Sequence, residues 1–252
     1  MSASLQNMTK VFERPESLTD ARFTYCPGCH HGILTRIIGN VMDELDIAER
    51  TVGIAPVGCS VFAYLWYKAD SQQVAHGRAC AVATGIKRAR PDLVVFSYQG
   101  DGDFASIGTA ESIHAANRGE NITVIFVNNQ IYGMTGGEMA PTTLIDQKTT
   151  TTPYGRSAEL FGYPIRFSEM IAQLEAPAYV TRQALFDTKH IMDATRAIKK
   201  AFQYQVDGKG FSLVEVLSTC PTNWRMSPVQ ANKYVAETVT GIFPLGDLVD
   251  RG

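Results

Sequence analysis

Two polar segments, each directly after an apolar run, hold the residue types of this chain best suited to chemistry. Gly100-Asp101-Gly102 follows the run 93–98, and Asn128-Asn129 follows the run 122–127. Carboxylate and amide oxygens suit Mg²⁺ when it also binds phosphate, and glycine lets the backbone approach a diphosphate closely. The pattern therefore predicts a magnesium and diphosphate site. A turn that happens to use Gly, Asp and Asn is the alternative interpretation.

The elements around these segments bring both to one edge of a sheet. The two apolar runs are short, continuous and rich in β-branched and aromatic residues, as buried parallel strands are, and 106–118 is predicted to be the helix between them. Further strands are predicted at 51–57 and 213–217. Open α/β sheets bind ligands at the carboxyl ends of their strands. We expect an α/β fold, with a mainly parallel sheet and helices on both faces.

The cysteines are the second set of candidate ligands. Four of the five lie in loops beside predicted elements: Cys26, Cys29, Cys59 and Cys220. Four converging thiolates can hold an iron–sulfur cluster or a zinc ion, and their spacing does not decide between the two. A disulfide or a thioredoxin-like redox pair at the CxxC is disfavoured, because Pro precedes Gly here and a cytoplasm is reducing. Cys80, in the predicted helical stretch 72–90, is expected to be a small buried residue.

Composition narrows the class of protein. With 252 residues, 45% of them hydrophobic, the chain can bury a full core, and we expect one domain over 1–252. A net charge of -2 and a pI near 6.2, without a basic patch interleaved with aromatics, argue against nucleic-acid binding. No apolar run approaches membrane-spanning length, and 1–10 is polar rather than signal-like. A soluble cytoplasmic protein is expected.

Taken together, five motifs resemble the β subunit of 2-oxoacid:ferredoxin oxidoreductases. In order they are YCPGCHHG at 25–32, VGCS at 57–60, HGRA at 76–79, GDGD at 100–103 and NNQIYGMTGG at 128–137. The likeness runs from Tyr25 to Cys220. It implies the diphosphate-type fold of thiamine diphosphate enzymes and the coenzyme A-dependent oxidative decarboxylation of a 2-oxoacid to acyl-CoA and CO₂. Electrons would pass singly through a [4Fe-4S] cluster to ferredoxin.

The resemblance also implies roles for particular residues. Mg²⁺ would be held by Asp101, Asn129 and the carbonyl of Ile131, and the cluster by Cys26, Cys29, Cys59 and Cys220. The cofactor site as a whole would comprise Cys59, His76, Gly100, Asp101, Gly102, Asp103, Asn129, Ile131, Gly133, Met134 and Thr135.

Six side chains near these motifs have a less specific role or two interpretations. Met134, Thr135 and Arg78 are predicted to border the substrate and the thiazolium. His76 and Arg78 are predicted to lie in a helix, where Arg78 would bind a substrate carboxylate or the diphosphate, or else form a structural ion pair. His30 and His31 would donate hydrogen bonds to cluster sulfurs, or would be solvated residues at a helix start.

The resemblance implies that the chain is inactive alone. The Glu that activates the cofactor would lie in the pyrimidine-type domain of an α subunit, and γ and ferredoxin-like δ subunits are expected besides soluble ferredoxin. No second CxxCxxCxxxCP run, typical of ferredoxins, occurs here. The segment 228–252, apolar without a clear period, is expected to form a tail that packs on a partner subunit.

The substrate is predicted from the loop residues. Met134, Val61 and Phe62 would make an apolar pocket, and 60–66 holds no cation to pair with a distal carboxylate. A branched-chain 2-oxoacid such as 2-oxoisovalerate is therefore favoured, with 2-oxoglutarate next. Two other classes of protein stay open. They are a non-redox thiamine diphosphate decarboxylase or synthase subunit with structural zinc, and a non-catalytic scaffold that binds zinc and a nucleotide diphosphate.

Overall fold

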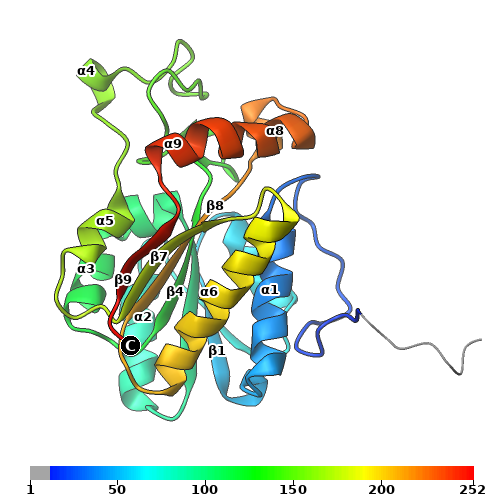
Figure 1. Ribbon diagram of the computed structural model, residues 1–252, viewed down its shortest axis with the longest axis vertical. Helices are drawn as coiled ribbons and strands as arrows, with labels where there is room; N and C mark the ends of the chain where they lie inside the picture. Colours follow the sequence, from blue (N-terminus) through cyan, green and yellow to red (C-terminus); the bar gives the residue numbers. More distant parts are fainter. Residues whose placement is uncertain (1–11) are drawn as a thin grey trace, which may run out of the picture.

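The fold is built on one seven-stranded sheet (Figure 1). The computed structural model describes residues 12–252, so the polar segment 1–10 lies outside the described residues. The strands are β1 (Thr51–Ala55), β2 (Asp70–Gln73), β3 (Val94–Gly100), β4 (Thr123–Asn128), β7 (Tyr179–Ala184), β8 (Ser212–Leu217) and β9 (Gly246–Asp250). Their order is β2-β1-β3-β4-β8-β7-β9, and only β9 runs antiparallel, along β7. The mainly parallel sheet is confirmed.

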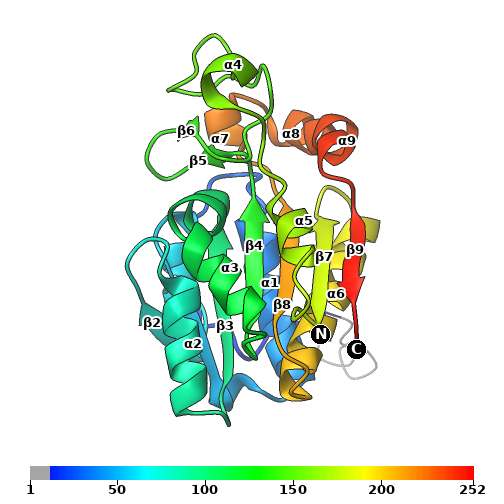
Figure 2. The ribbon, with the colours of Figure 1, turned by 90° about the vertical axis from the view of Figure 1, so that its left-hand side faces the viewer.

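Helices cover both faces of this sheet (Figures 1 and 2). One face is covered by α1 (His31–Glu44) and α6 (Thr188–Val206), and the other by α2 (Ala79–Ala89), α3 (Thr109–Asn117) and α5 (Phe167–Ala172). Side chains alternate along a strand, so Phe96 packs with the first pair of helices and Val95 with the second group. Two apolar cores result, and the expected α/β layering is confirmed.

A cap of short elements stands above the carboxyl ends of the parallel strands (Figure 2). It comprises β5 (Ile131–Tyr132), β6 (Glu138–Met139), α4 (Ala158–Phe161), α7 (Pro221–Trp224), α8 (Pro228–Tyr234) and α9 (Thr240–Ile242). Open α/β sheets bind ligands at this edge. The cap therefore shapes the place where the polar motifs lie.

The stretch 72–90 was predicted to be helical, but its first residues are not in a helix. Residues 70–73 form the edge strand β2, and α2 begins only at Ala79. Residues 70–73 are polar and all exposed, so they carry no alternating pattern that would have revealed a strand. His76 and Arg78 therefore lie in the turn before α2, and the prediction that they are helical is wrong.

The helix predicted at 106–118 is confirmed in part. A π-helical segment, Asp103–Ile107, precedes α3, and Gly119 ends it with φ +62°. The turn before α2 lies against this junction, because a Cβ on Gly77 would be 2.6 Å from the Gly108 nitrogen and one on Gly108 would be 2.7 Å from the Gly77 carbonyl oxygen. Only glycines permit so close an approach of two backbones. This contact brings His76 beside Asp103.

The segment 228–252 packs on its own chain. Four of its buried apolar residues are Ala231, Val235, Val239 and Phe243. They recur every fourth position, which is a helical period that the sequence analysis did not recognise. The segment then ends in β9, which pairs with β7 at the edge of the sheet.

Candidate cofactor site at the carboxyl edge of the sheet

All eleven residues predicted to form the cofactor site line one cavity of about 90 Å³. Its wall also includes five residues that were not predicted for it: His31, Val57, Gly58, Ser60 and Tyr132. Arg78 is not part of this wall. Its guanidinium pairs with Glu111, as the alternative of a structural ion pair expected. A cavity of this size is far smaller than the 300–1,000 Å³ of typical ligand pockets.

Asp101 projects from the end of β3 into this cavity. Its Oδ1 accepts a hydrogen bond from the Gly102 N–H at 2.8 Å, and its Oδ2 accepts one from the Thr142 hydroxyl at 2.6 Å. The side chain is buried, and burial raises the pKa of the Asp101 carboxyl to about 7. A bound cation would offset this desolvation, because it favours the charged carboxylate.

A strained backbone turn positions Asn129. Gln130 has φ +57°, and its side-chain amide donates to the Asn128 carbonyl at 2.9 Å and to the Asn128 Oδ1 at 2.8 Å. The Thr143 hydroxyl donates to the Gln130 carbonyl at 2.6 Å. These bonds hold Gln130 in the left-handed region, which is costly for a residue with a side chain. They turn Asn129 and Ile131 toward the cavity on either side of Gln130.

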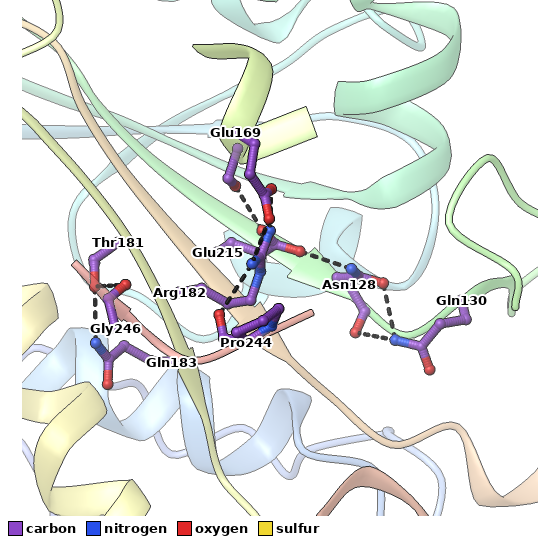
Figure 3. A network of polar contacts seen from close by, with 10 residues as sticks. Asn128, Gln130, Glu169, Thr181, Arg182, Gln183, Glu215, Pro244 and Gly246 are labelled. Carbon is purple, nitrogen blue, oxygen red and sulfur yellow. Dashed lines mark hydrogen bonds and ion pairs between the residues drawn. The ribbon is translucent and has the colours of Figure 1, made fainter. Parts of the chain in front are cut away.

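A buried ion-pair network supports this turn from beneath the sheet edge (Figure 3). The Asn128 amide donates to Glu215 Oε1 at 2.7 Å, and Glu215 Oε2 accepts from Arg182 Nε at 2.8 Å. Arg182 also binds both carboxylate oxygens of Glu169 and donates to the Pro244 carbonyl at 3.0 Å. Both residues are buried, with Arg182 0% and Glu215 1% exposed. The network thus ties the Asn128–Asn129 motif to the 228–252 segment.

Replacing Arg182 by Met should therefore destabilise the fold strongly. The Met side chain fills part of the space but leaves two carboxylates without a cation, and breaking a buried ion pair costs about 3–5 kcal/mol. Thermal unfolding of the purified complex measures the loss. Arg196→Met is the matched control. The Arg196 side chain pairs with Asp193 but is 68% exposed, so its replacement should change the free energy of unfolding by less than about 1 kcal/mol. Equal unfolding midpoints for the two variants would contradict this account of the network.

The four candidate cluster cysteines come together above the same edge. A Cβ built on Gly133 would lie 3.4 Å from Cys220 Sγ and 3.5 Å from Cys59 Sγ. Burial raises the pKa of the Cys29 thiol to about 12 and that of Cys59 to about 11, and negative charge on neighbouring cysteines raises both further. Within residues 12–252, however, no three His, Cys, Asp or Glu side chains gather round one point as ligands of a single ion do. The thiols are close enough to affect one another but are spread in space.

Residues of the 228–252 segment hold the CxxC turn in place. Gly28 has φ +77°, and a Cβ there would lie 2.5 Å from Pro228 Cβ, so only glycine fits. The Gly28 carbonyl accepts a hydrogen bond from the Thr219 hydroxyl at 2.7 Å, which joins the turn to the loop of Cys220. His30 Nε2 lies 2.7 Å from Asn232 Oδ1 in α8.

Both histidines after the CxxC are buried. His30 is 3% exposed and His31 2%, so the interpretation of solvated histidines is wrong. His31 Nδ1 lies 2.5 Å from the Tyr98 hydroxyl, and burial lowers the pKa of His31 to about 3. No hydrogen bond to a cysteine sulfur is found for either ring within residues 12–252. They pack the cluster loop against the core and against α8.

The cavity has the features that a phosphate-bearing cofactor with a metal ion requires. Its oxygen donors are the carboxylate of Asp101 and the amide of Asn129. The Ser60 hydroxyl is buried and has no hydrogen-bond partner among the described residues. A Cβ built on Gly58 or Gly100 would have no other atom within 4 Å, so both glycines leave open space for a ligand. The residues present therefore fit thiamine diphosphate with Mg²⁺.

Sequence reasoning missed the supporting residues of this site. Glu215 and Arg182 are each the one charged residue of a largely buried strand, and a lone charge in such a run is the signal that could have identified them. Thr142 and Ser60 carry no local signal, because their importance arises from contacts with segments far away in the chain.

Comparisons with known proteins agree with this geometry. The family model "Thiamine pyrophosphate enzyme, C-terminal TPP binding domain" matches residues 56–216. Ketoisovalerate oxidoreductase subunit VorA of Methanothermobacter thermautotrophicus is 53% identical over 96% of this chain, which spans 50% of that relative. 2-Oxoglutarate synthase subunit KorB of Methanocaldococcus jannaschii is 39% identical over 84% of this chain and 77% of its own length. This chain therefore has about half the length of its VorA relative.

A solved structure has the same fold along the whole chain. It is a 2-oxoglutarate:ferredoxin oxidoreductase from Magnetococcus marinus with 2-oxoglutarate, coenzyme A and succinyl-CoA bound, similar with a TM-score of 0.79 and 26% identity. The match covers 99% of this chain and 87% of that one. None of the helices within residues 12–252 combines the length and apolar character that a membrane span needs.

Proposed function

Because this chain belongs to the 2-oxoacid:ferredoxin oxidoreductase subunits of the VorA and KorB type, we propose that it is the thiamine diphosphate-binding part of an acyl-CoA-forming enzyme. The reaction is the coenzyme A-dependent oxidative decarboxylation of a 2-oxoacid, with CO₂ released and electrons passed to ferredoxin. One observation carries the proposal. The Gly100-Asp101-Gly102 and Asn128-Asn129 motifs line one cavity together with Cys59, one of four neighbouring cysteines.

In this proposal Mg²⁺ is held by the side chains of Asp101 and Asn129 and by the Ile131 carbonyl. Hard oxygen ligands suit this ion, which would bridge to the diphosphate. Thiamine diphosphate supplies an electron sink for the loss of CO₂. The protein residues would hold the metal and leave room for the cofactor at Gly100.

The cysteines are proposed to hold a [4Fe-4S] cluster. The pKa of the Cys29 thiol is raised by burial and by negative charge on Cys220, Cys59 and Cys26, so the four thiols are neighbours and could together hold such a cluster. One-electron transfer to ferredoxin also requires a redox centre, and zinc has no redox chemistry.

Partner subunits are proposed to complete the site. A cavity of about 90 Å³ is too small for a whole cofactor, so the activating Glu and the pyrimidine-type domain are assigned to an α subunit. Subunits γ and δ and soluble ferredoxin would carry electrons onward. The 228–252 segment packs on its own chain, and its exposed Val229 and Ile242 are the residues through which it would also contact a partner.

The substrate is proposed to be a branched-chain 2-oxoacid such as 2-oxoisovalerate. Met134 lines the cavity and is 44% exposed, and no Lys or Arg is found in the cavity wall within residues 12–252. Val61 is buried and Phe62 packs toward Trp66, so of the predicted apolar pocket residues only Met134 lines the cavity. The VorA relative supports this choice. 2-Oxoglutarate is the second candidate, favoured by the names of the KorB relative and of the solved structure.

Kinetics with competing substrates test whether 2-oxoisovalerate is the substrate. With the native complex, kcat/KM for 2-oxoisovalerate should exceed that for pyruvate by at least about 10-fold, because its side chain has two more carbons and a single buried methylene contributes about 1–3 kcal/mol, or about 10- to 200-fold. Met134→Asn should shift the preference toward pyruvate. A higher kcat/KM for 2-oxoglutarate would mean that a cation from a partner subunit completes the pocket.

An anaerobic spectrum and a metal assay of the purified complex test the proposed function. A brown protein that contains iron and loses its visible band when 2-oxoacid and coenzyme A are added supports it. A colourless, zinc-containing protein with thiamine diphosphate-dependent decarboxylation would identify a non-redox enzyme. The absence of any dependence on thiamine diphosphate would identify a scaffold.

A further inference from the structure

Asp103 holds His76 in one orientation at the wall of the cavity. His76 Nδ1 lies 2.5 Å from Asp103 Oδ1, which also accepts from the Gly77 N–H at 2.7 Å. Asp103 Oδ2 accepts from Gln99 Nε2 at 2.5 Å. The carboxylate is 1% exposed and already has three donors. It therefore has little capacity to bind a cofactor, although it was predicted as part of that site, and it instead orients the imidazole.

The bonds behind Asp103 determine which ring nitrogen carries the proton. Gln99 Oε1 accepts from the Ser97 hydroxyl at 2.9 Å and from Cys80 Sγ at 3.2 Å, so its Nε2 is the atom that donates to Asp103. Asp103 then acts as acceptor toward every neighbour, including His76 Nδ1. The proton of a neutral His76 is thereby held on Nδ1, and Nε2 is the acceptor.

His76 Nε2 remains available. No hydrogen bond of His76 other than that to Asp103 is found within residues 12–252. The ring lines the cavity beside Met134 and Thr135, and its side chain is 28% exposed. It therefore has access to the reaction space and to water, which a group that accepts and then releases a proton needs.

The proposed reaction requires such a group. One 2-oxoacid anion, one coenzyme A thiol and two oxidised ferredoxins yield acyl-CoA, CO₂, two reduced ferredoxins and one proton. The titratable residues in the cavity wall are His31, Cys59, His76, Asp101, Asp103 and Tyr132. The ion pair of Arg78 with Glu111 lies outside this wall.

Each of the other groups is occupied or unsuitable. His31 is buried against Tyr98, and its pKa is lowered by burial to about 3. Cys59 and Asp101 are assigned to the cluster and to Mg²⁺, and Asp103 is saturated by its donors. Burial raises the pKa of the Tyr132 phenol, so it stays protonated. Among the titratable groups that this chain contributes to the wall, His76 is the one whose acceptor nitrogen has no partner within residues 12–252.

We propose that His76 Nε2 accepts the thiol proton of coenzyme A as the new carbon–sulfur bond forms, with Asp103 and Gln99 as positioning residues. This inference rests on the proposed function. The S–H bond breaks, its proton moves to Nε2 and then to water, and the two electrons of the oxidation leave to ferredoxin. No other reactant is needed.

His76→Asn in the reconstituted complex tests the inference. The Asn amide occupies the place of Nδ1, so Asp103 keeps a donor while the acceptor at Nε2 is lost. Two rates are compared, namely electron release to a viologen with 2-oxoacid alone and with coenzyme A added. Their ratio should fall about 100-fold or more, as the loss of a general base does. Both rates are expressed per bound thiamine diphosphate and per cluster, which are measured on the same preparation.

Two further variants make the test specific. Asp103→Asn should lower the same ratio, because an amide no longer holds the proton on Nδ1, and added imidazole should restore part of the rate in His76→Gly. His114→Asn, at an exposed histidine of α3, is the matched control and should leave the ratio unchanged. A ratio in His76→Asn within about threefold of native, or an equal loss of both rates, would overturn the assignment. A native complex without any 2-oxoacid-dependent reduction would instead overturn the proposed function.

Discussion

Replacing Asp101 by Ala is expected to remove thiamine diphosphate and Mg²⁺ from the complex and to leave its iron content near normal. The carboxylate is the only formal charge among the proposed magnesium ligands, and losing the metal's charge against a diphosphate costs several kcal/mol, or on the order of 100-fold or more in affinity. The fold should tolerate the change, because the buried carboxyl already has its pKa raised to about 7 by desolvation.

Cofactor content after gel filtration measures the Asp101 effect, with magnesium and iron assayed on the same fractions. Asp101→Asn serves as a variant of equal size, and it should bind the metal more weakly than the native residue. Asp92→Ala is the control, since Asp92 is exposed and pairs with Arg90. If Asp101→Ala kept the thiamine diphosphate content of the native complex, the assignment of the cofactor site would be wrong.

Cys220→Ser should cost the complex most of its iron, whereas Cys80→Ser should not. Cys220 Sγ and Cys59 Sγ both lie within 3.5 Å of the same point beside Gly133, and a hydroxyl is a poor ligand for a soft metal site. Cys80 is a buried thiol that contacts Gln99 and Ser112, where a serine hydroxyl can make the same bonds. The same loss is expected for serine at Cys26, Cys29 and Cys59.

Iron per complex and the rate of ferredoxin reduction test these four ligands. The two substitutions are matched, because both place a hydroxyl at a buried cysteine. Loss of iron in Cys80→Ser with retention in Cys220→Ser would show that the four-cysteine set is wrong. A fall in thermal stability of Cys80→Ser with normal iron would be consistent with its role in packing.

The sequence alone was sufficient to predict the secondary-structure elements whose signals are local. The runs that became β3 and β4 are continuous and apolar because both faces of the central sheet are covered, and their polar motifs follow at once. A glycine-rich motif after a strand also has few physical uses other than close approach to a ligand. The strands β1, β3, β4 and β8, the layering and eleven of the sixteen residues of the cavity wall could therefore be anticipated.

Tertiary structure decided what depends on contacts between distant segments. The polar edge strand β2 has no pattern of its own, because its residues are exposed on both faces. The 228–252 segment shows its helical period only once the core beneath it is known. Arg182 with Glu215, and His76 with Asp103, are pairs of residues 33 and 27 positions apart. Arg182 meets Glu215 because β7 and β8 pair in register at these two residues, and His76 meets Asp103 because the segments after β2 and β3 lie at the same edge of the sheet. No spacing in the sequence records which side chains meet.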